Sequence, residues 1–283
     1  MSDIEMRDIK KHLASQLEKY VYIIKKEYGE FIPKDRLDFL NAITNYEDLI
    51  KIEDTGTITC FVRDGKIYFP LLAYKVLNSL KKIPGFGMCP NHTTYNKDTV
   101  VINDNTFNTY ILHAFLNGLT SLEFYEEMIL HETMHLCGFN GNLALLEGIT
   151  ELKTRELAKK YSLKTNSCGY PKEVKLVNKL QTIFGSTLIT KLGLCSTNAH
   201  RRYVIFEALG DEGVCFFGNI INMMEEEFQT KYNKYNMSFT GLTAPIKKAL
   251  KYNEINYDAI YKVIDDFCFK YNRDSANDAN RLK

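Results

Sequence analysis

The chain has 283 residues, of which 45% are hydrophobic, 12% aromatic and 25% charged. This is the composition of an ordinary globular protein, and the length suits one large core or two lobes around a cleft. Thirty-six lysines and arginines against 35 aspartates and glutamates leave a net charge of +1, which gives no long-range attraction to nucleic acid or anionic lipid. No apolar run approaches the ~20 residues of a membrane span. We therefore expect neither nucleic acid nor a membrane as a partner.

The N-terminal sequence MSDIEMRDIKKH is charged and lacks the apolar core and cleavage site of a secretory signal peptide. We therefore expect a cytoplasmic protein, although injected effectors and phage proteins also lack such a signal. The seven cysteines are widely spaced and include no Cys-x-x-Cys pair. This pattern favours reduced, buried thiols over a disulfide framework.

The first part of the chain predicts two helices. Over residues 1–28, apolar side chains recur at three- and four-residue steps, with charged side chains between them. This spacing is typical of an amphipathic helix that packs on a core, and Gly29 and Pro33 end it. A second, shorter helical stretch follows over Lys34–Lys51.

The periodicity then changes to that of β-structure. Residues Thr57–Phe69 are rich in β-branched and aromatic side chains, with Asp64 and Gly65 in the middle. Asp-Gly between two such runs is a strong hairpin signal, because both central residues of the turn need positive φ. A short helix is predicted over Ala73–Lys82 and a further strand over Thr99–Ile102.

The rest of the chain predicts helices almost throughout. This pattern starts at about Thr106 and is interrupted by turn-forming residues. The predicted breaks lie near Gly118, 138–142, 164–171 and 196–198.

One helical segment carries the residues of a metal site. It opens with Thr120-Ser-Leu-Glu123, a capping box that satisfies free backbone amides at a helix start. The same helix contains His131, Glu132 and His135, the HExxH pattern. Two histidines four residues apart share one helical face and can occupy adjacent corners of a tetrahedral zinc site. Glu132 can reach a water on the metal and act as general base.

Such a site needs a third protein ligand. The metzincin pattern would place a histidine at position 141, but that residue is glycine. The other solution is a glutamate on the following helix, where Glu147 and Glu151 lie one turn apart on one face. Glu147 can ligate the metal while Glu151 supports a ligand histidine, and Glu151 is the alternative third ligand.

This segment resembles the zinc metallopeptidases of the zincin superfamily, in particular the gluzincin branch. The resemblance is carried by the HExxH pattern at His131–His135 and by Glu147-Gly-Ile-Thr-Glu151, which is similar to the EGxxE element of that branch. It covers about 30 to 40 residues, and 11 residues separate His135 from Glu147, fewer than in thermolysin. The resemblance implies zinc bound by His131, His135 and Glu147, with Glu132 as the general base.

Peptide hydrolysis also needs a group that stabilises the oxyanion formed when water attacks the carbonyl. Gluzincins usually supply a tyrosine or histidine from the downstream lobe. The candidate segment here is Asn198–Gly210, in which Tyr203 is the first choice and His200 the second. Because the chain has 18 tyrosines, a packing role for Tyr203 is an equal alternative.

Together these features predict a zincin-like α+β protein. Residues 1–165 would form an N-terminal lobe with the small sheet and the zinc-binding helices, and residues 166–283 a helical lobe that closes the cleft. The predicted function is hydrolysis of a peptide or protein substrate by a zinc-activated water, with Glu132 as base. Two alternatives stay open: a zinc-binding sensor or binding module without turnover, and a helical interaction protein in which HExxH is accidental.

Overall fold

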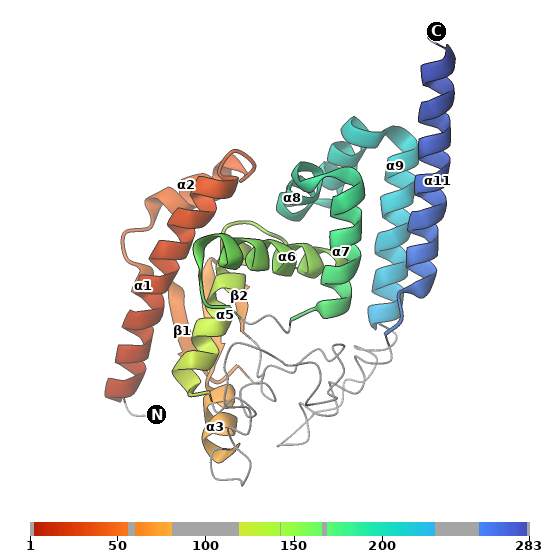
Figure 1. The fold of residues 1–283 in the computed structure, drawn as a ribbon. Coiled ribbons are helices and arrows are strands. Elements are labelled where there is room, and N and C mark those ends of the chain that lie inside the picture. The colour runs from red at the N-terminus through yellow and green to blue at the C-terminus, as the bar shows by residue number, and fades with distance from the viewer. Residues whose placement is uncertain are drawn as a thin grey trace.

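The computed structural model describes residues 3–55, 60–80, 119–141, 143–165, 169–229 and 255–281. This part of the chain is α+β and mostly helical, with a small sheet of three strands (Figure 1). Its strands are β1 (Ile50–Glu53), β2 (Phe61–Arg63) and β3 (Lys66–Pro70). Its helices are α1 (Asp3–Tyr28), α2 (Lys34–Ala42), the 3-10 helix η1 (Tyr46–Leu49), α3 (Leu71–Leu80), α5 (Ser121–Leu136), α6 (Ala144–Tyr161), α7 (Pro171–Phe184), α8 (Ser186–Leu194), α9 (Asn198–Phe228) and α11 (Asp258–Arg281). Within these ranges, no helix has an apolar stretch long enough to cross a bilayer.

The sheet has β3 in its centre. β1 pairs with β3 in parallel, with Ile50 opposite Ile67, and β2 pairs with β3 antiparallel. Asp64 and Gly65 form the tight turn between β2 and β3 with φ angles of 51° and 69°, which confirms the predicted hairpin. The strand predicted over Thr99–Ile102 lies outside the described residues.

The second predicted helix is shorter than expected. α2 ends at Ala42, and the side chain of Asn45 accepts a hydrogen bond from the backbone N–H of Glu47 at 3.1 Å. This contact stabilises a local turn in place of a continuing helix. The residues that follow η1 form β1, which the helical pattern did not predict, because pairing with β3 is a long-range interaction.

α1 is the predicted amphipathic helix, and it packs against α5, η1 and β1. Its fully buried residues include Leu13, Leu17 and Ile24, which belong to the hydrophobic core. At its C-terminal end, the Glu27 carboxylate accepts a hydrogen bond from the Lys160 ammonium on α6 at 2.6 Å. α1 therefore packs on α5 and is joined to the C-terminal end of α6 by this ion pair.

α6 runs across the middle of the molecule and packs against α5 on one side and α7, α8 and α9 on the other (Figure 1). Its Lys153 is completely buried, and the ammonium donates to Gln181 at 2.6 Å, Ser186 at 2.7 Å and Glu156 at 3.0 Å. These bonds fasten α6 to α7 and α8. The predicted division of the chain between residues 165 and 166 stays a prediction.

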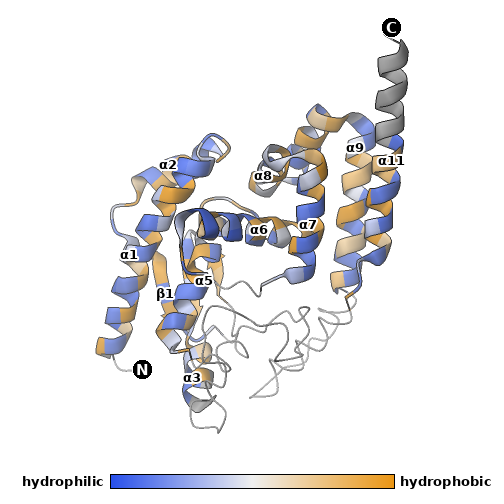
Figure 2. Ribbon diagram, in the orientation of Figure 1, coloured by the Kyte–Doolittle hydropathy of each residue, from blue (hydrophilic) through white to orange (hydrophobic). Residues whose placement is uncertain are grey.

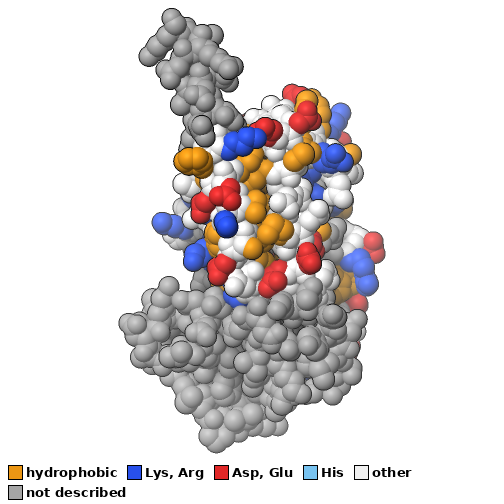
Figure 3. All heavy atoms as spheres, turned by 90° about the vertical axis from the view of Figure 1, so that its right-hand side faces the viewer, with side chains coloured by type: hydrophobic (Ala, Val, Ile, Leu, Met, Phe, Trp, Pro, Cys, Tyr) orange, Lys and Arg blue, Asp and Glu red, His pale blue; other side chains and the backbone are white. Residues whose placement is uncertain are grey.

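The C-terminal helices pack through aromatic rings. Phe184, Phe216 and Phe267 meet with ring centroids 4.0 to 5.9 Å apart. α9 is kinked at Gly210, whose φ of 66° is outside the helical region. Figure 2 shows apolar and polar residues alternating along α9 and α11, and Figure 3 shows hydrophobic and charged side chains mixed on the side where α11 lies. The predicted breaks near 138–142, 164–171 and 196–198 fall between the ends of α5 and α6, α6 and α7, and α8 and α9. Gly118, residue 142 and residues 166–168 lie outside the described residues.

Candidate metal centre

Local interactions define both ends of α5, the helix that carries the HExxH residues: a capping box at its N-terminus and a glycine turn after its C-terminus. The Thr120 hydroxyl accepts from the Glu123 backbone N–H at 3.2 Å, and the Glu123 carboxylate accepts from the Thr120 N–H at 2.7 Å, so the predicted capping box is confirmed. After the helix, Gly138 adopts a φ of 113°, and the Phe139 N–H donates to the Met134 carbonyl at 3.0 Å. This reversal turns the chain back toward the motif histidines.

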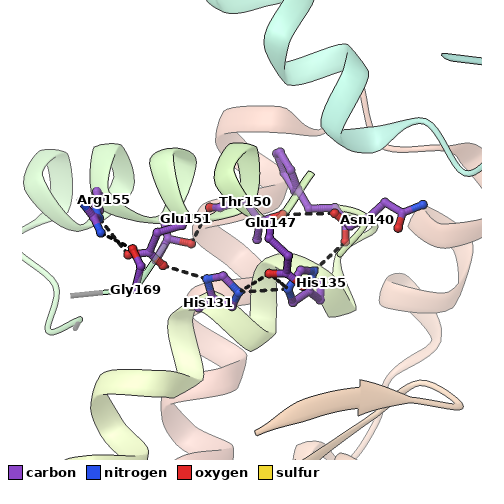
Figure 4. A network of polar contacts seen from close by, with 10 residues as sticks. His131, His135, Asn140, Glu147, Thr150, Glu151, Arg155 and Gly169 are labelled. Atoms are coloured by element: carbon purple, nitrogen blue, oxygen red, sulfur yellow. Dashed lines mark hydrogen bonds and ion pairs between the residues drawn. The ribbon is translucent and has the colours of Figure 1, made fainter. Parts of the chain in front are cut away.

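Three side chains converge where α5 ends and α6 begins (Figure 4). The two Nε2 atoms of His131 and His135 lie 3.0 Å apart. Oε2 of Glu147 lies 3.3 Å from Nε2 of His131 and 3.5 Å from Nε2 of His135. Two ligands of a tetrahedral zinc ion at bond lengths of about 2.0–2.1 Å are roughly 3.3 Å apart. The two Nε2 atoms and Oε2 of Glu147 form a triangle of that size. These three residues could hold a metal ion.

A series of polar contacts orients the His131 ring through Nδ1, the nitrogen that points away from the triangle. Nδ1 of His131 lies 2.9 Å from Oε2 of Glu151, which is 1% exposed. Arg155 donates through Nε to the other Glu151 oxygen at 2.8 Å and through Nη2 to the Gly169 carbonyl (Figure 4). Glu151 therefore lies behind the histidine, while Glu147 lies in the triangle.

The second histidine is oriented in the same way by the backbone. Nδ1 of His135 lies 2.9 Å from the Phe139 carbonyl oxygen, which can only accept a hydrogen bond. A proton on this Nδ1 leaves Nε2 with its lone pair directed at the triangle. Both histidines thus use Nδ1 for support and present Nε2 to the centre.

The glycine at position 141 leaves room for the third ligand. A Cβ on Gly141 would lie 2.5 Å from Oε1 of Glu147 and 2.5 Å from Cε1 of His135, closer than non-bonded atoms approach. The loop is fixed by the Asn140 N–H, which donates to the Gly193 carbonyl at 2.8 Å. A larger residue at 141 would displace the Glu147 carboxylate.

The first turn of α6, which carries Glu147, is stabilised by residues of other helices. Leu143 at the N-cap offers no side-chain acceptor, and the carboxylate of Glu225 on α9 accepts a hydrogen bond from the Ala144 N–H. Gly148 lets α7 approach closely, since a Cβ there would lie 2.7 Å from Cβ of Glu173. Long-range contacts with α7 and α9 therefore set the position of this helix.

The electrostatics of the triangle favour positive charge at its centre. Burial alone would lower the pKa of His131, but the carboxylates of Glu147 and Glu151 outweigh it and raise that pKa well above its ordinary value. Burial would raise the pKa of Glu147, but His135 and His131 outweigh it and hold the pKa of Glu147 at about 2. A cation bound between these groups is stabilised by the same carboxylates.

Glu132 is a buried carboxylate beside the triangle. Burial raises its pKa, the two histidines oppose this effect, and the charge of Glu147 adds to it. Oε2 of Glu132 is buried without a hydrogen-bond partner among the described residues. Because buried carboxylate oxygens are normally satisfied, this atom can accept a hydrogen bond from a group in the cavity.

A cavity of about 390 Å³ opens onto the triangle. Besides Glu132 and the three candidate ligands, its lining includes Arg36 of α2, Phe61 and Val62 of β2, and Tyr170. The Tyr170 ring stacks on His131, with centroids 5.9 Å apart and an interplanar angle of 15°. Neither Arg36 nor Tyr170 is expected at a site from the sequence alone. Tyr170 precedes Pro171 at the start of α7, but no local pattern signals its contact with His131.

The two residues predicted to stabilise the oxyanion, Tyr203 and His200, both lie on α9. Tyr203 is 60% exposed on α9, and His200 is also exposed in the first turn of that helix. Neither lines the cavity among the described residues. Their role in catalysis stays a prediction.

The chain was compared with known proteins at three levels. No protein-family model matches it, and neither a curated protein nor a solved structure matches it. The support for a metal site is therefore the geometry of His131, His135 and Glu147.

Proposed function

We propose that this protein is a zinc-dependent peptidase in which Glu132 is the general base. The observation that carries the proposal is the triangle of His131, His135 and Glu147, with the buried carboxylate of Glu132 beside it. Two imidazole nitrogens and one carboxylate oxygen form a known donor set of catalytic zinc, which leaves a coordination position open. A bound zinc ion would activate both the substrate carbonyl and the attacking water. The likeness of the HExxH and EGITE elements to gluzincins supports the same proposal.

Glu132 is suited to moving a proton in the cavity. Its burial raises its pKa from the ordinary carboxylate value, which brings the group closer to the pH at which it both accepts and returns a proton efficiently. It would take the proton of the attacking water and deliver it to the leaving amine. Glu151 and the Phe139 carbonyl keep the two histidines in the tautomer that presents Nε2.

The cavity suits an extended peptide as substrate. β2 pairs with β3 on one side and is one of the two edge strands of the described sheet. Phe61 and Val62 of this strand line the cavity. An extended peptide can bind along a sheet edge through main-chain hydrogen bonds, and such a peptide would pass beside the triangle.

The test compares wild type with Glu132→Gln on a peptide library, with zinc content measured on both. We expect wild type to cleave peptides and Glu132→Gln to keep zinc but lose activity by a factor of about 10² to 10⁴, the usual contribution of a general base. Glu207→Gln, an exposed glutamate on α9, is the matched control and stays active. A Glu132→Gln variant as active as wild type would overturn the proposal. A zinc-loaded wild type that cleaves nothing in the library would favour a binding module without turnover.

A further inference from the structure

Arg36 is the only lysine or arginine among the described residues that line the cavity. It lies on α2, and its side-chain stem packs against the turn that follows α5, where Cγ is 3.4 Å from the position of a Cβ on Gly138. Its guanidinium carbon lies 5.5 Å from the centroid of the Phe39 ring. Phe39 in turn lies against Gly65 in the β2–β3 turn. The arginine is therefore positioned by α2, by the hairpin turn and by the loop after α5.

The guanidinium has no carboxylate partner within the described part of the chain. No ion pair joins Arg36 to an acidic side chain there, and its only recorded ring contact is with Phe39. The neighbouring acids Asp35 and Asp38 are exposed, and residues one or two positions apart do not face each other on a helix. A half-buried arginine without an anion retains its five donors for a ligand.

The net charge of the cavity indicates that the ligand of Arg36 is an anion. In a zinc-loaded cavity, the carboxylates of Glu132 and Glu147 neutralise the two positive charges of the ion, and the histidine ligands are neutral. Arg36 then leaves the cavity with a net charge of +1. Low-dielectric walls strengthen the attraction of such a site for an anion.

We propose that Arg36 determines specificity by binding a carboxylate of the substrate, so that the cavity selects acidic peptides or free peptide C-termini. This inference rests on the proposed peptidase function. Arginine matches a carboxylate with two parallel N–H···O bonds, and the carboxylate can belong to an aspartate or glutamate side chain or to the chain terminus. The two sources present the same chemistry and are distinguished in the experiment below.

The experiment measures binding in the zinc-loaded Glu132→Gln background, where peptides are not consumed. The probes are three degenerate fluorescein-labelled hexapeptide pools: neutral with a C-terminal amide, acidic with a C-terminal amide, and neutral with a free C-terminal carboxylate. Fluorescence anisotropy gives the apparent Kd of each pool. We expect at least one carboxylate-bearing pool to bind about tenfold more tightly than the neutral amide pool.

Changes at Arg36 should reduce that preference. The Glu132→Gln background adds one positive charge to the cavity in every variant, so the effect of Arg36 is the change in preference between variants. Arg36→Gln is expected to reduce the preference about fivefold or more, and Arg36→Glu to abolish it. Arg202→Gln, an exposed arginine on α9, is the matched control and leaves the preference unchanged. Melting temperature and zinc content, measured on every variant, confirm that the cavity is intact.

The outcomes separate this inference from the peptidase proposal. Preference for the acidic amide pool would show that Arg36 binds a side-chain carboxylate of the peptide. Preference for the free-carboxylate pool would show that it binds the C-terminal carboxylate. Equal binding of all pools, or an undiminished preference in a folded, zinc-loaded Arg36→Gln variant, overturns the inference even if wild type cleaves peptides. An Arg36-dependent preference in a protein that cleaves nothing sustains carboxylate recognition while the peptidase proposal fails.

Discussion

The α5–α6 pair and the α9–α11 pair bury different kinds of side chain. Around α5 and α6, His131, Glu132 and Glu151 are buried, and His131 and Glu151 each have a polar partner behind the triangle. Around α9 and α11, the packing includes contacts between aromatic rings such as Phe216 and the half-buried Phe267, and Arg201 near the start of α9 is a buried charged side chain. Burying polar groups costs free energy unless they are partnered. The first pair is therefore specialised to hold charge in fixed positions, whereas the second supplies apolar packing.

The largest expected effect comes from closing the space beside Glu147. Gly141→Ala places a methyl group where the Glu147 carboxylate and the His135 ring lie, so one ligand must move out of the triangle. Because a site with the wrong geometry loses most of its metal affinity, we expect zinc affinity to fall by roughly 100-fold or more. Gly218→Ala on α9, where a Cβ meets nothing within 4 Å, is the control. Competition with a chromogenic chelator measures both, and unchanged affinity in Gly141→Ala would contradict the geometry.

A smaller loss is expected from the group behind His131. Glu151→Gln keeps the shape of the side chain but removes the charge that faces Nδ1 of His131 and Nε of Arg155. Loss of such a supporting carboxylate typically costs 10- to 100-fold in metal affinity. The same chelator titration checks this, with Glu207→Gln as the exposed control. If zinc affinity falls by less than twofold, the Glu151–His131 contact is not a support of the site.

Tyr170, at the start of α7, and Tyr203, on α9, offer a direct comparison between a residue beside the α5–α6 pair and one on the α9–α11 pair. Tyr170 lines the cavity and stacks on His131, whereas Tyr203 is exposed on α9. We expect Tyr170→Ala to lower kcat/KM on a cleaved peptide by about tenfold, since it removes a wall of the substrate cavity, and Tyr203→Ala to change it by less than twofold. The reverse order of effects would restore Tyr203 as the oxyanion-stabilising residue that its sequence position predicts.

The smallest expected effect is on stability and comes from the contact between α9 and α6. Glu225 of α9 caps the N-terminus of α6 through the Ala144 N–H, and loss of such a cap costs about 1 kcal/mol. We expect Glu225→Ala to reduce the free energy of unfolding by that amount in urea titrations. Glu226→Ala, which removes the exposed neighbour, should stay within about 0.5 kcal/mol of wild type. Equal stability of the two variants would contradict the capping role.

Local patterns predicted the parts of the fold that local interactions determine. The capping box at Thr120 and the Asp64-Gly65 turn each depend on a few adjacent residues, and both have the predicted form. The same reasoning applies to His131 and His135, because helical spacing alone places two residues four apart on one face. The turn after α5 then brings Glu147 to them.

Long-range interactions explain what the sequence did not predict. β1 forms because it pairs with β3, and Arg36 and Tyr170 reach the cavity because α2 and the start of α7 pack near α5. The steric role of Gly141 is also visible only once Glu147 is in place. Tyr203 is exposed on α9 and is not among the described residues that line the cavity, so its predicted role in catalysis stays a prediction.

The central claim is that His131, His135 and Glu147 form one zinc site. The most direct test is metal content by plasma mass spectrometry on purified wild type and Glu147→Ala after reconstitution with zinc, with unfolding curves to show that both are folded. The geometry predicts one zinc ion per chain in wild type and none in Glu147→Ala. A wild type that takes up no zinc, or a Glu147→Ala variant that keeps it, would contradict the claim.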